Sequence, residues 1–122
     1  MRHLFVTFAV GMLSACGMPA SEQSSAMPAL NEAAQSKRFS TFQNALEASP
    51  SDRSADWQLS SNVFGSVTPI DTVYSKADGW CRSYEEVIVD GSKRYRIVGI
   101  ACRDAPRRWL VLDVRPVGGG AE

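Results

Sequence analysis

The two fragments GWCRSY and GIACRD contain Cys81 and Cys102, and their spacing limits how this chain folds more than any other feature. If Cys81 lies opposite Cys102 on neighbouring antiparallel strands, the same register places Asp90 opposite Lys93. A two-residue turn that begins with Gly91 then joins the strands, and a tight glycine-containing loop of this length is typical of a β-hairpin. Cysteine spacing and turn chemistry therefore predict the same hairpin independently of each other.

The predicted hairpin has two partly apolar faces. Its register puts Tyr84 opposite Gly99, so that a ring can lie over a residue with no side chain. Because side chains alternate along a strand, one face carries Trp80, Tyr84 and Ile88 with Tyr95, Ile97 and Ala101. The other face carries Cys81, Ser83, Val87 and Val89 with Val98, Ile100 and Cys102. We expect a helix to cover one face, and further strands or a partner to shield the other.

Residues 1–15 have the pattern of an export signal. Arg2 supplies a positive charge, and the apolar run Leu4–Leu13 has the length of a signal-peptide core. This run is too short for a membrane-spanning helix, which needs roughly 20 residues. The segment ends in LSAC, and small residues directly before a cysteine resemble the lipobox of bacterial lipoproteins. An ordinary secretory signal with a chance cysteine is the alternative.

The lipobox resemblance implies that Cys16 becomes the first residue of the mature chain and is acylated, with palmitate as a typical chain. Each buried methylene of an acyl chain contributes about 0.8 kcal/mol to membrane binding. In such lipoproteins an aspartate after the cysteine favours retention at the inner membrane, and here Gly17 stands in that place. We therefore expect a lipid anchor at the outer membrane, with the domain on the periplasmic face or exposed at the cell surface.

Acylation of Cys16 would leave two cysteines in an exported chain, where an oxidising compartment favours disulfides. We predict that Cys81 and Cys102 form a structural disulfide, which closes a loop of roughly 20 residues and contributes about 3 kcal/mol. Their Cα atoms are then expected about 4.4–6.8 Å apart. Two alternatives stay open: a reactive thiol, whose pKa the adjacent arginine would depress, and, less favoured, a metal site.

Composition argues against catalysis and against nucleic-acid binding. The 13 basic and 13 acidic residues balance, which does not suggest a general nucleic-acid binder. The one histidine, His3, lies in the signal, so the mature chain lacks the commonest general base and zinc ligand. Glu85 and Glu86 are neighbours on a predicted strand, where their side chains point to opposite faces and cannot act as an acid/base pair. We expect no enzyme, no cofactor and no metal.

The chain divides into a tether, one domain and a tail. Residues 16–28 are small and polar, as in a flexible tether. Residues 29–117 are expected to form one small α+β domain, and residues 118–122 a disordered tail. Within the domain, Asn31 is a candidate cap for a helix that runs to Ala48, just before a proline-containing loop.

The expected helix carries an apolar stripe and is followed by short strands. The stripe consists of Phe39, Phe42 and Leu46, extended by Met27, Leu30 and Ala34. Its polar face is not markedly basic, so we expect the helix to pack on a small antiparallel meander rather than on a membrane surface. Runs rich in Val, Ile, Tyr and Trp predict the strands. They are Asp56–Ser60, Val63–Thr68, Asp71–Ser75, Trp80–Asp90, Lys93–Arg103 and Trp109–Arg115.

Several motifs occur together along the domain: ALE before a proline, Trp57, GSVTP, GWCRSY, Gly91, GIACR and Trp109. On these motifs the chain, from about Phe39 to Val114, resembles the surface-antigen domain of rickettsial-type outer-membrane lipoproteins, the seventeen-kilodalton antigen family. The resemblance implies an α+β domain on an acylated, outer-membrane-associated protein without enzymatic activity.

The chain departs from that family in two places. Family members often carry a glycine-rich, membrane-interacting segment between lipobox and domain, and the tether here has no such run. The resemblance therefore gives no basis for an insertion function of the tether. The family's usual glycine-containing turn before the last tryptophan is replaced by APRR, which makes this turn more basic.

Six arginines in the C-terminal half form a candidate site for an anionic partner, such as a lipopolysaccharide phosphate or a peptidoglycan carboxylate. They are Arg82, Arg94, Arg96, Arg103, Arg107 and Arg108. An ordinary solvated hairpin, paired with Glu85, Glu86 and Asp104, is the favoured interpretation. We therefore expect a non-enzymatic outer-membrane lipoprotein with a structural or interaction role in the envelope. The alternative is a periplasmic binding or inhibitor module that captures a protein or an anionic glycan.

Overall fold

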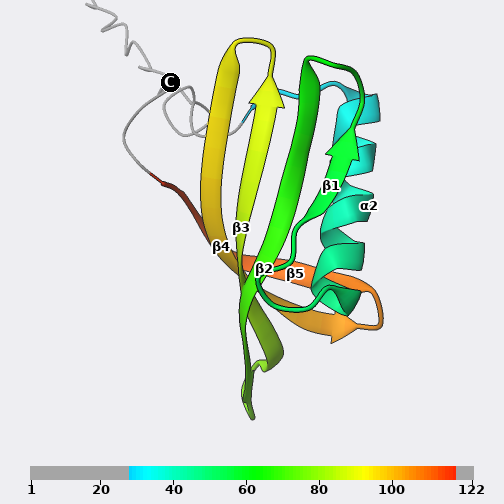
Figure 1. Cartoon of the computed structure of the whole chain (residues 1–122). Coiled ribbons are helices and arrows are strands. Elements are labelled where there is room, and N and C mark those ends of the chain that lie inside the picture. Colours follow the sequence, from blue (N-terminus) through cyan, green and yellow to red (C-terminus); the bar gives the residue numbers. More distant parts are fainter. Residues whose placement is uncertain (1–27, 118–122) are drawn as a thin grey trace, which may run out of the picture.

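The computed structural model describes residues 28–117, which form one helix and one five-stranded antiparallel sheet (Figure 1). The elements, which keep their chain order across the sheet, are α2 (Glu32–Ala48), β1 (Ala55–Gln58), β2 (Val63–Ser75), β3 (Gly79–Asp90), β4 (Lys93–Ala105) and β5 (Arg108–Pro116). The predicted α+β meander is confirmed. The signal, Cys16, the tether up to residue 27 and the tail lie outside the described residues. In the described part, α2 is neither long nor apolar enough to cross a membrane.

Helix α2 begins and ends where the sequence predicted. The Asn31 side chain accepts a hydrogen bond from the Ala34 N–H at 2.8 Å, the contact expected of an N-cap. At the other end the Ser49 N–H donates to the Ala45 carbonyl at 2.8 Å. Pro50 follows, and a proline cannot continue a helix. Both boundaries are therefore set by local chemistry.

The prediction of which α2 side chains are buried is only partly right. Ala34, Phe42 and Leu46 are buried, but Phe39 is 65 % exposed. Arg38 stands four residues after Ala34 and four before Phe42, so Arg38 faces the sheet in that turn. Its guanidinium pairs with a buried glutamate of the sheet, and Phe39 is left at the rim of the contact.

Strand β2 is one continuous strand where the sequence suggested two. The expected runs Val63–Thr68 and Asp71–Ser75 are joined, and the pairing with β3 shifts between Pro69 and Thr72. A proline has no N–H for the ladder, and an irregularity of this kind accommodates it. The proline therefore shifts the register without ending the strand.

The β3–β4 hairpin has the predicted register. Cys81 pairs with Cys102 and Asp90 with Lys93, and Gly91 in the turn has a φ of 63°, in the region that favours glycine. A disulfide joins the two cysteines, whose Cα atoms lie 4.0 Å apart, slightly closer than the predicted range. Such close approach is typical of a non-hydrogen-bonded pair, in which Cα atoms lie about 4.5 Å apart.

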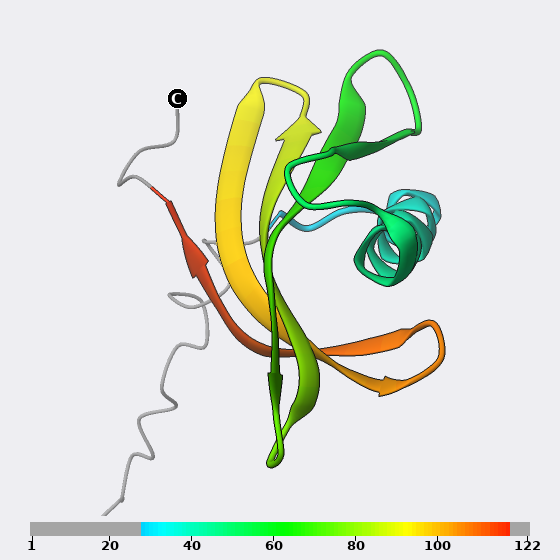
Figure 2. The ribbon, with the colours of Figure 1, turned by 60° about the horizontal axis from the view of Figure 1, so that its bottom comes forward.

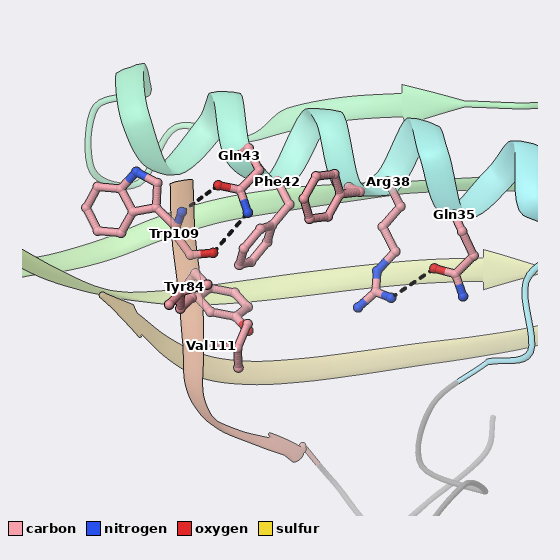
Figure 3. Close-up of a pocket in the computed structure, with 9 residues that line it drawn as sticks. Gln35, Arg38, Phe42, Gln43, Tyr84, Trp109 and Val111 are labelled. Carbon is pink, nitrogen blue, oxygen red and sulfur yellow. Dashed lines mark hydrogen bonds between the residues drawn. The ribbon is translucent and has the colours of Figure 1, made fainter. Parts of the chain in front are cut away.

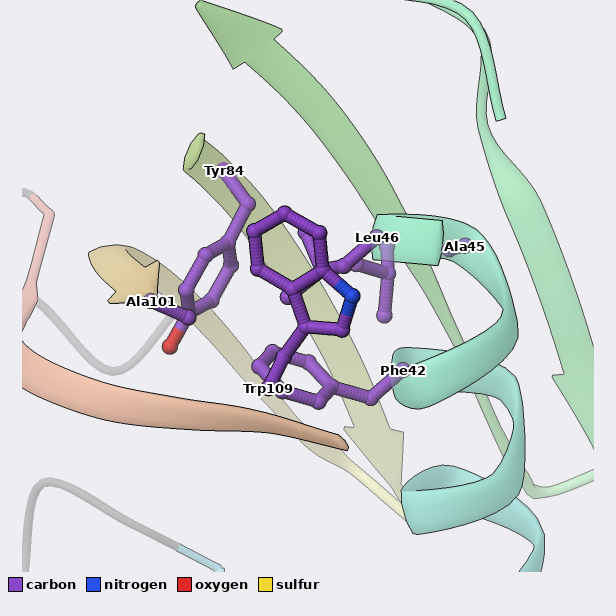
Figure 4. Close-up of a cluster of buried hydrophobic side chains, with 7 residues drawn as sticks. Phe42, Ala45, Leu46, Tyr84, Ala101 and Trp109 are labelled. Carbon is purple, nitrogen blue, oxygen red and sulfur yellow. The ribbon is translucent and has the colours of Figure 1, made fainter. Parts of the chain in front are cut away.

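Helix α2 covers the face of the hairpin on which Tyr84 lies, and a first buried cluster forms between them (Figure 4). The Phe42 ring meets the Tyr84 ring edge-on, with 5.0 Å between centroids. A Cβ atom on Gly99 would lie 2.5 Å from the Tyr84 hydroxyl, so the predicted placement of this ring over a glycine is confirmed. The members of the cluster are Phe42, Ala45, Leu46, Val67, Tyr84, Ala101 and Trp109.

A second buried cluster lies nearer the β3–β4 turn. It consists of Ala34, Trp57, Ile88 and Ile97, with Leu30 and Tyr95 packed against it. Met27, expected on the same helix face, lies outside the described residues. Trp80 was predicted on the same face as Tyr84, but it is 51 % exposed, because the β2–β3 hairpin projects past the end of α2 (Figure 1). There its ring packs against Tyr74, with 5.2 Å between centroids.

The opposite face of the sheet has no second layer within residues 28–117. The strands twist strongly, and the β4–β5 turn reaches beneath the C-terminal end of α2 (Figure 2). Val73 and Ile100 on the uncovered face are 62 % and 42 % exposed. Further strands therefore do not shield this face in the described part of the chain, and a partner stays a prediction.

Candidate functional site

A buried ion pair joins α2 to the middle of the sheet. Glu86 on β3 is 1 % exposed, and both of its carboxylate oxygens accept from Arg38, from Nε at 2.7 Å and from a terminal nitrogen at 2.9 Å. The hydrogen bonds to Glu86 raise the pKa of Arg38. A buried carboxylate is tolerated only when it is paired in this way. The pair therefore serves the packing of α2 and is not poised for acid/base chemistry.

Gln43 joins α2 to strand β5 through the backbone of Trp109 (Figure 3). The Trp109 N–H donates to the Gln43 side-chain oxygen at 2.6 Å, and the Gln43 side-chain nitrogen donates to the Trp109 carbonyl at 2.9 Å. Both groups are buried. A primary amide has the same donor and acceptor as a peptide group. The Gln43 side chain therefore makes with Trp109 the two hydrogen bonds that a residue of a neighbouring strand would make.

Glu47, one helical turn later, completes the attachment of α2 to β4 and β5. Its carboxylate accepts two hydrogen bonds from Arg103, at 3.1 and 2.8 Å, and one from the Trp109 indole nitrogen at 2.8 Å. The bonds from Arg103, and next the bond from Trp109, lower the pKa of Glu47 to about 2. Glu47 is therefore ionised at neutral pH and bound to its partners.

A groove with a volume of about 340 Å³ lies between α2 and β5 (Figure 3). Phe42 and Tyr84 line it, and the exposed side chains of Phe39 and Val111 flank it, at 65 % and 48 % exposure. Burial raises the pKa of Tyr84 to about 12, so its phenol stays neutral at physiological pH. The groove is mainly apolar, which suits contact with an apolar surface better than proton transfer.

Arg82, the first of the six candidate arginines, is buried. Its guanidinium donates to the Thr72 hydroxyl at 2.9 Å and to the Leu46 carbonyl at 2.9 Å. Carbonyl groups at the C-terminal end of a helix carry partial negative charge, which a cation stabilises. Desolvation lowers the pKa of Arg82. Arg82 therefore caps α2 and is not presented to a partner.

Three further candidate arginines are engaged with carboxylates. Arg103 binds Glu47, as described above, and Arg96 binds Glu85 at 2.8 Å. Arg108 lies 2.6 Å from Asp104 in the β4–β5 turn. The favoured sequence interpretation, a hairpin with internally paired arginines, agrees with these contacts, although Glu86 pairs with Arg38 of the helix.

The last two candidates lie at opposite ends of β4. Arg94 follows the β3–β4 turn and lines a shallow hollow on the uncovered face with Val87 and Val89. Arg107 lies in the β4–β5 turn with a φ of 61°. The structure therefore does not bring the six arginines together. Sequence reasoning missed Arg38, Gln43 and Glu47, because a polar residue on a helix carries no local sign of a tertiary partner.

Metal-ligating side chains are also dispersed. In residues 28–117 there is no group of three or more His, Cys, Asp or Glu side chains that could hold a metal ion.

The chain shares sequence with curated proteins named 17 kDa surface antigen. Over 74 residues, which are 60 % of this chain and 46 % of each relative, it is 36 % identical to that of Rickettsia bellii (strain RML369-C), 38 % to that of Rickettsia felis and 35 % to that of Rickettsia prowazekii. The chain thus spans about half the length of these relatives. No protein-family model and no solved structure matches it. As the motifs predicted, this chain is related, over those 74 residues, to the 17 kDa surface antigens.

Proposed function

We propose that this protein is a non-enzymatic outer-membrane lipoprotein, similar to the surface antigens, with a structural or interaction role in the cell envelope. The observation that carries the proposal is the LSAC stretch, which ends at Cys16 after an apolar run, in a chain whose relatives are named surface antigens. Acylation at Cys16 would anchor the domain, and the residue after it, Gly17, favours the outer membrane over the inner one.

The hydrogen bonding of the polar side chains supports a role in binding other molecules rather than in catalysis. Each of the buried polar residues Gln43, Arg82 and Glu86 is hydrogen-bonded across the interface between helix and sheet. Groups held in such bonds contribute to one rigid packing of α2. The exposed apolar groups at the groove and along β5 are instead available for binding.

Cell fractionation of two variants tests the anchor. We expect Cys16→Ser to move the protein from the membrane to the soluble fraction, because no acyl chain can be attached. Gly17→Asp keeps the acylated cysteine and should move the protein from the outer to the inner membrane. Cys81→Ala with Cys102→Ala serves as the control, since loss of a disulfide in the domain should leave membrane association unchanged. If Cys16→Ser stays in the membrane to the same extent as the parent chain, the proposal is wrong.

A further inference from the structure

We propose that strand β5 is an interaction surface for a second copy of this chain: two β5 strands pair antiparallel around a two-fold axis at Val114 and join the two sheets into one. The inference goes beyond the proposed function and does not depend on the lipid anchor. It rests on three features of β5, namely its open backbone edge, its exposed apolar side chains and its self-complementary charges.

Among the described residues 28–117, side-chain hydrogen bonds cap the backbone edge of β5 only at its start. β5 is the last strand of the sheet, and Gln43 takes both the N–H and the C=O of Trp109. In an antiparallel ladder every second residue turns these groups the same way. Trp109 pairs with Arg103 of β4, Val111 pairs with Ala101, and Val114 pairs with Gly99. These three partners on β4 are each two residues apart. Val111 and Val114 therefore turn their backbone groups to the open edge.

Apolar side chains line both sides of this edge. Leu110, Val111, Leu112 and Val114 are 41–59 % exposed. The first three precede the acidic residue Asp113, and Val114 follows it. An exposed, apolar edge strand is a template for pairing with another strand, and monomeric proteins usually protect it. The pairing of β5 with β4 has two register shifts, one between Arg103 and Ala105 and one between Ile100 and Ala101, and no shift follows the second one along β5.

The charges of β5 fit a second copy of the same strand. With Val114 on the two-fold axis, Asp113 of each copy lies opposite Arg115 of the other, which gives two ion pairs. In the single chain these side chains are 62 % and 73 % exposed and 3.8 Å apart, so both remain available. Pro116 would lie opposite Leu112, and its missing N–H ends the ladder there. The same patch then serves both partners, as a two-fold interface requires.

A cysteine on the axis tests the register in the full-length protein. We expect Val114→Cys to form a disulfide-linked dimer under mild oxidation of whole envelopes, seen on a non-reducing gel, with peptide mapping that identifies a link between the two introduced cysteines. Tyr74→Cys is the control, because Tyr74 is 62 % exposed on strand β2, away from β5 and on the face opposite the disulfide. Equal dimer yields for the two variants would contradict the proposal, as would an adduct of Val114→Cys with a different protein.

Charge exchange tests the same interface without a new thiol. In analytical ultracentrifugation of the extracted protein, we expect Asp113→Arg to weaken dimerisation several-fold, because each copy then faces Arg115 with a like charge. Asp113→Arg combined with Arg115→Asp should restore it. A monomer at all concentrations, or a dimer insensitive to Asp113→Arg, would overturn the inference. Neither result depends on Cys16, so failure here is distinguishable from failure of the proposed function.

Discussion

Glu47 shows how single residues hold this small domain together. Its carboxylate accepts from Arg103 on β4 and from the Trp109 indole on β5, so one side chain of α2 secures two strands. Hydrogen bonds to an ionised acceptor are stronger than neutral ones. The side chain is 23 % exposed, so solvent weakens but does not remove this contribution.

The depressed pKa of Glu47 makes its contribution depend on pH. The folded value of about 2 lies below the ordinary 4.5, so Glu47 stabilises the fold above about pH 4.5 and loses this effect as the pH falls towards 2. We expect Glu47→Gln to lower the free energy of unfolding at pH 7 by about 1 kcal/mol, and to flatten its pH dependence between pH 4.5 and 2. Urea unfolding followed by tryptophan fluorescence measures both.

The control for this variant is Glu85→Gln, which removes an exposed ion pair with Arg96. Exposed pairs contribute little, so its effect at pH 7 should stay below about 0.5 kcal/mol. Equal losses for the two variants would mean that Glu47 has no special part in the attachment of α2.

At the scale of elements, Gln43 decides how strand β5 is held. We expect Gln43→Leu to lower the free energy of unfolding by about 1–3 kcal/mol, because it leaves the buried Trp109 N–H and C=O without partners. Hydrogen exchange of the Trp109 amide should become faster. Gln35→Leu, on the exposed part of the same helix, is the control and should leave this exchange rate unchanged. Undiminished protection of Trp109 in Gln43→Leu would show that the strand is held by other contacts.

The disulfide belongs to the β3–β4 hairpin and is expected to matter for stability. Its cysteines are 21 residues apart in the sequence. Cys81→Ala with Cys102→Ala should lower the free energy of unfolding by roughly 2–4 kcal/mol. Denaturant unfolding measures the loss, and non-reducing peptide mapping of protein from envelopes measures the bond itself. Free thiols at both positions would instead favour the reactive-thiol alternative.

The elements that the sequence predicted well are those set by local chemistry. The Asn31 cap and Pro50 bound α2, and the turn at Gly91 agrees with the cysteine spacing, so helix ends and hairpin register were both predictable. Phe39 was misplaced because Arg38, through its pairing with Glu86, occupies the buried position of that turn. Such ion pairs join residues far apart in the chain, and no local sequence pattern predicts them.

The candidate site was less predictable for the same reason. Six arginines in one stretch suggested a common basic surface, but alternation along the strands sends them to different faces. Arg82 turns inward to the end of α2, whereas Arg94 lies on the uncovered face. The Gln43 bridge and the open edge of β5 depend on the tertiary position of α2, which amphipathic spacing alone does not specify.

For the whole molecule, the start of the domain and the tip of the β2–β3 hairpin lie at opposite ends. Leu30 packs against the cluster that contains Ile97, close to the β3–β4 turn. The β2–β3 hairpin, where β3 begins at Gly79, instead projects past the other end of α2 (Figure 1). The proposed anchor at Cys16 would join the domain through the tether at the first of these ends. If the domain is anchored at Cys16, the exposed aromatic pair of Tyr74 and Trp80 lies at the end of the domain that is farther from the membrane anchor.

Mass spectrometry of the N-terminal peptide of membrane-extracted protein tests the central claim of this account, that the domain is carried on a lipid anchor. We predict a mature chain that begins at Cys16, with a mass increased by covalently bound acyl groups that include palmitate. A mature chain that begins at another residue, or an unmodified Cys16 in protein extracted from the membrane, would contradict it.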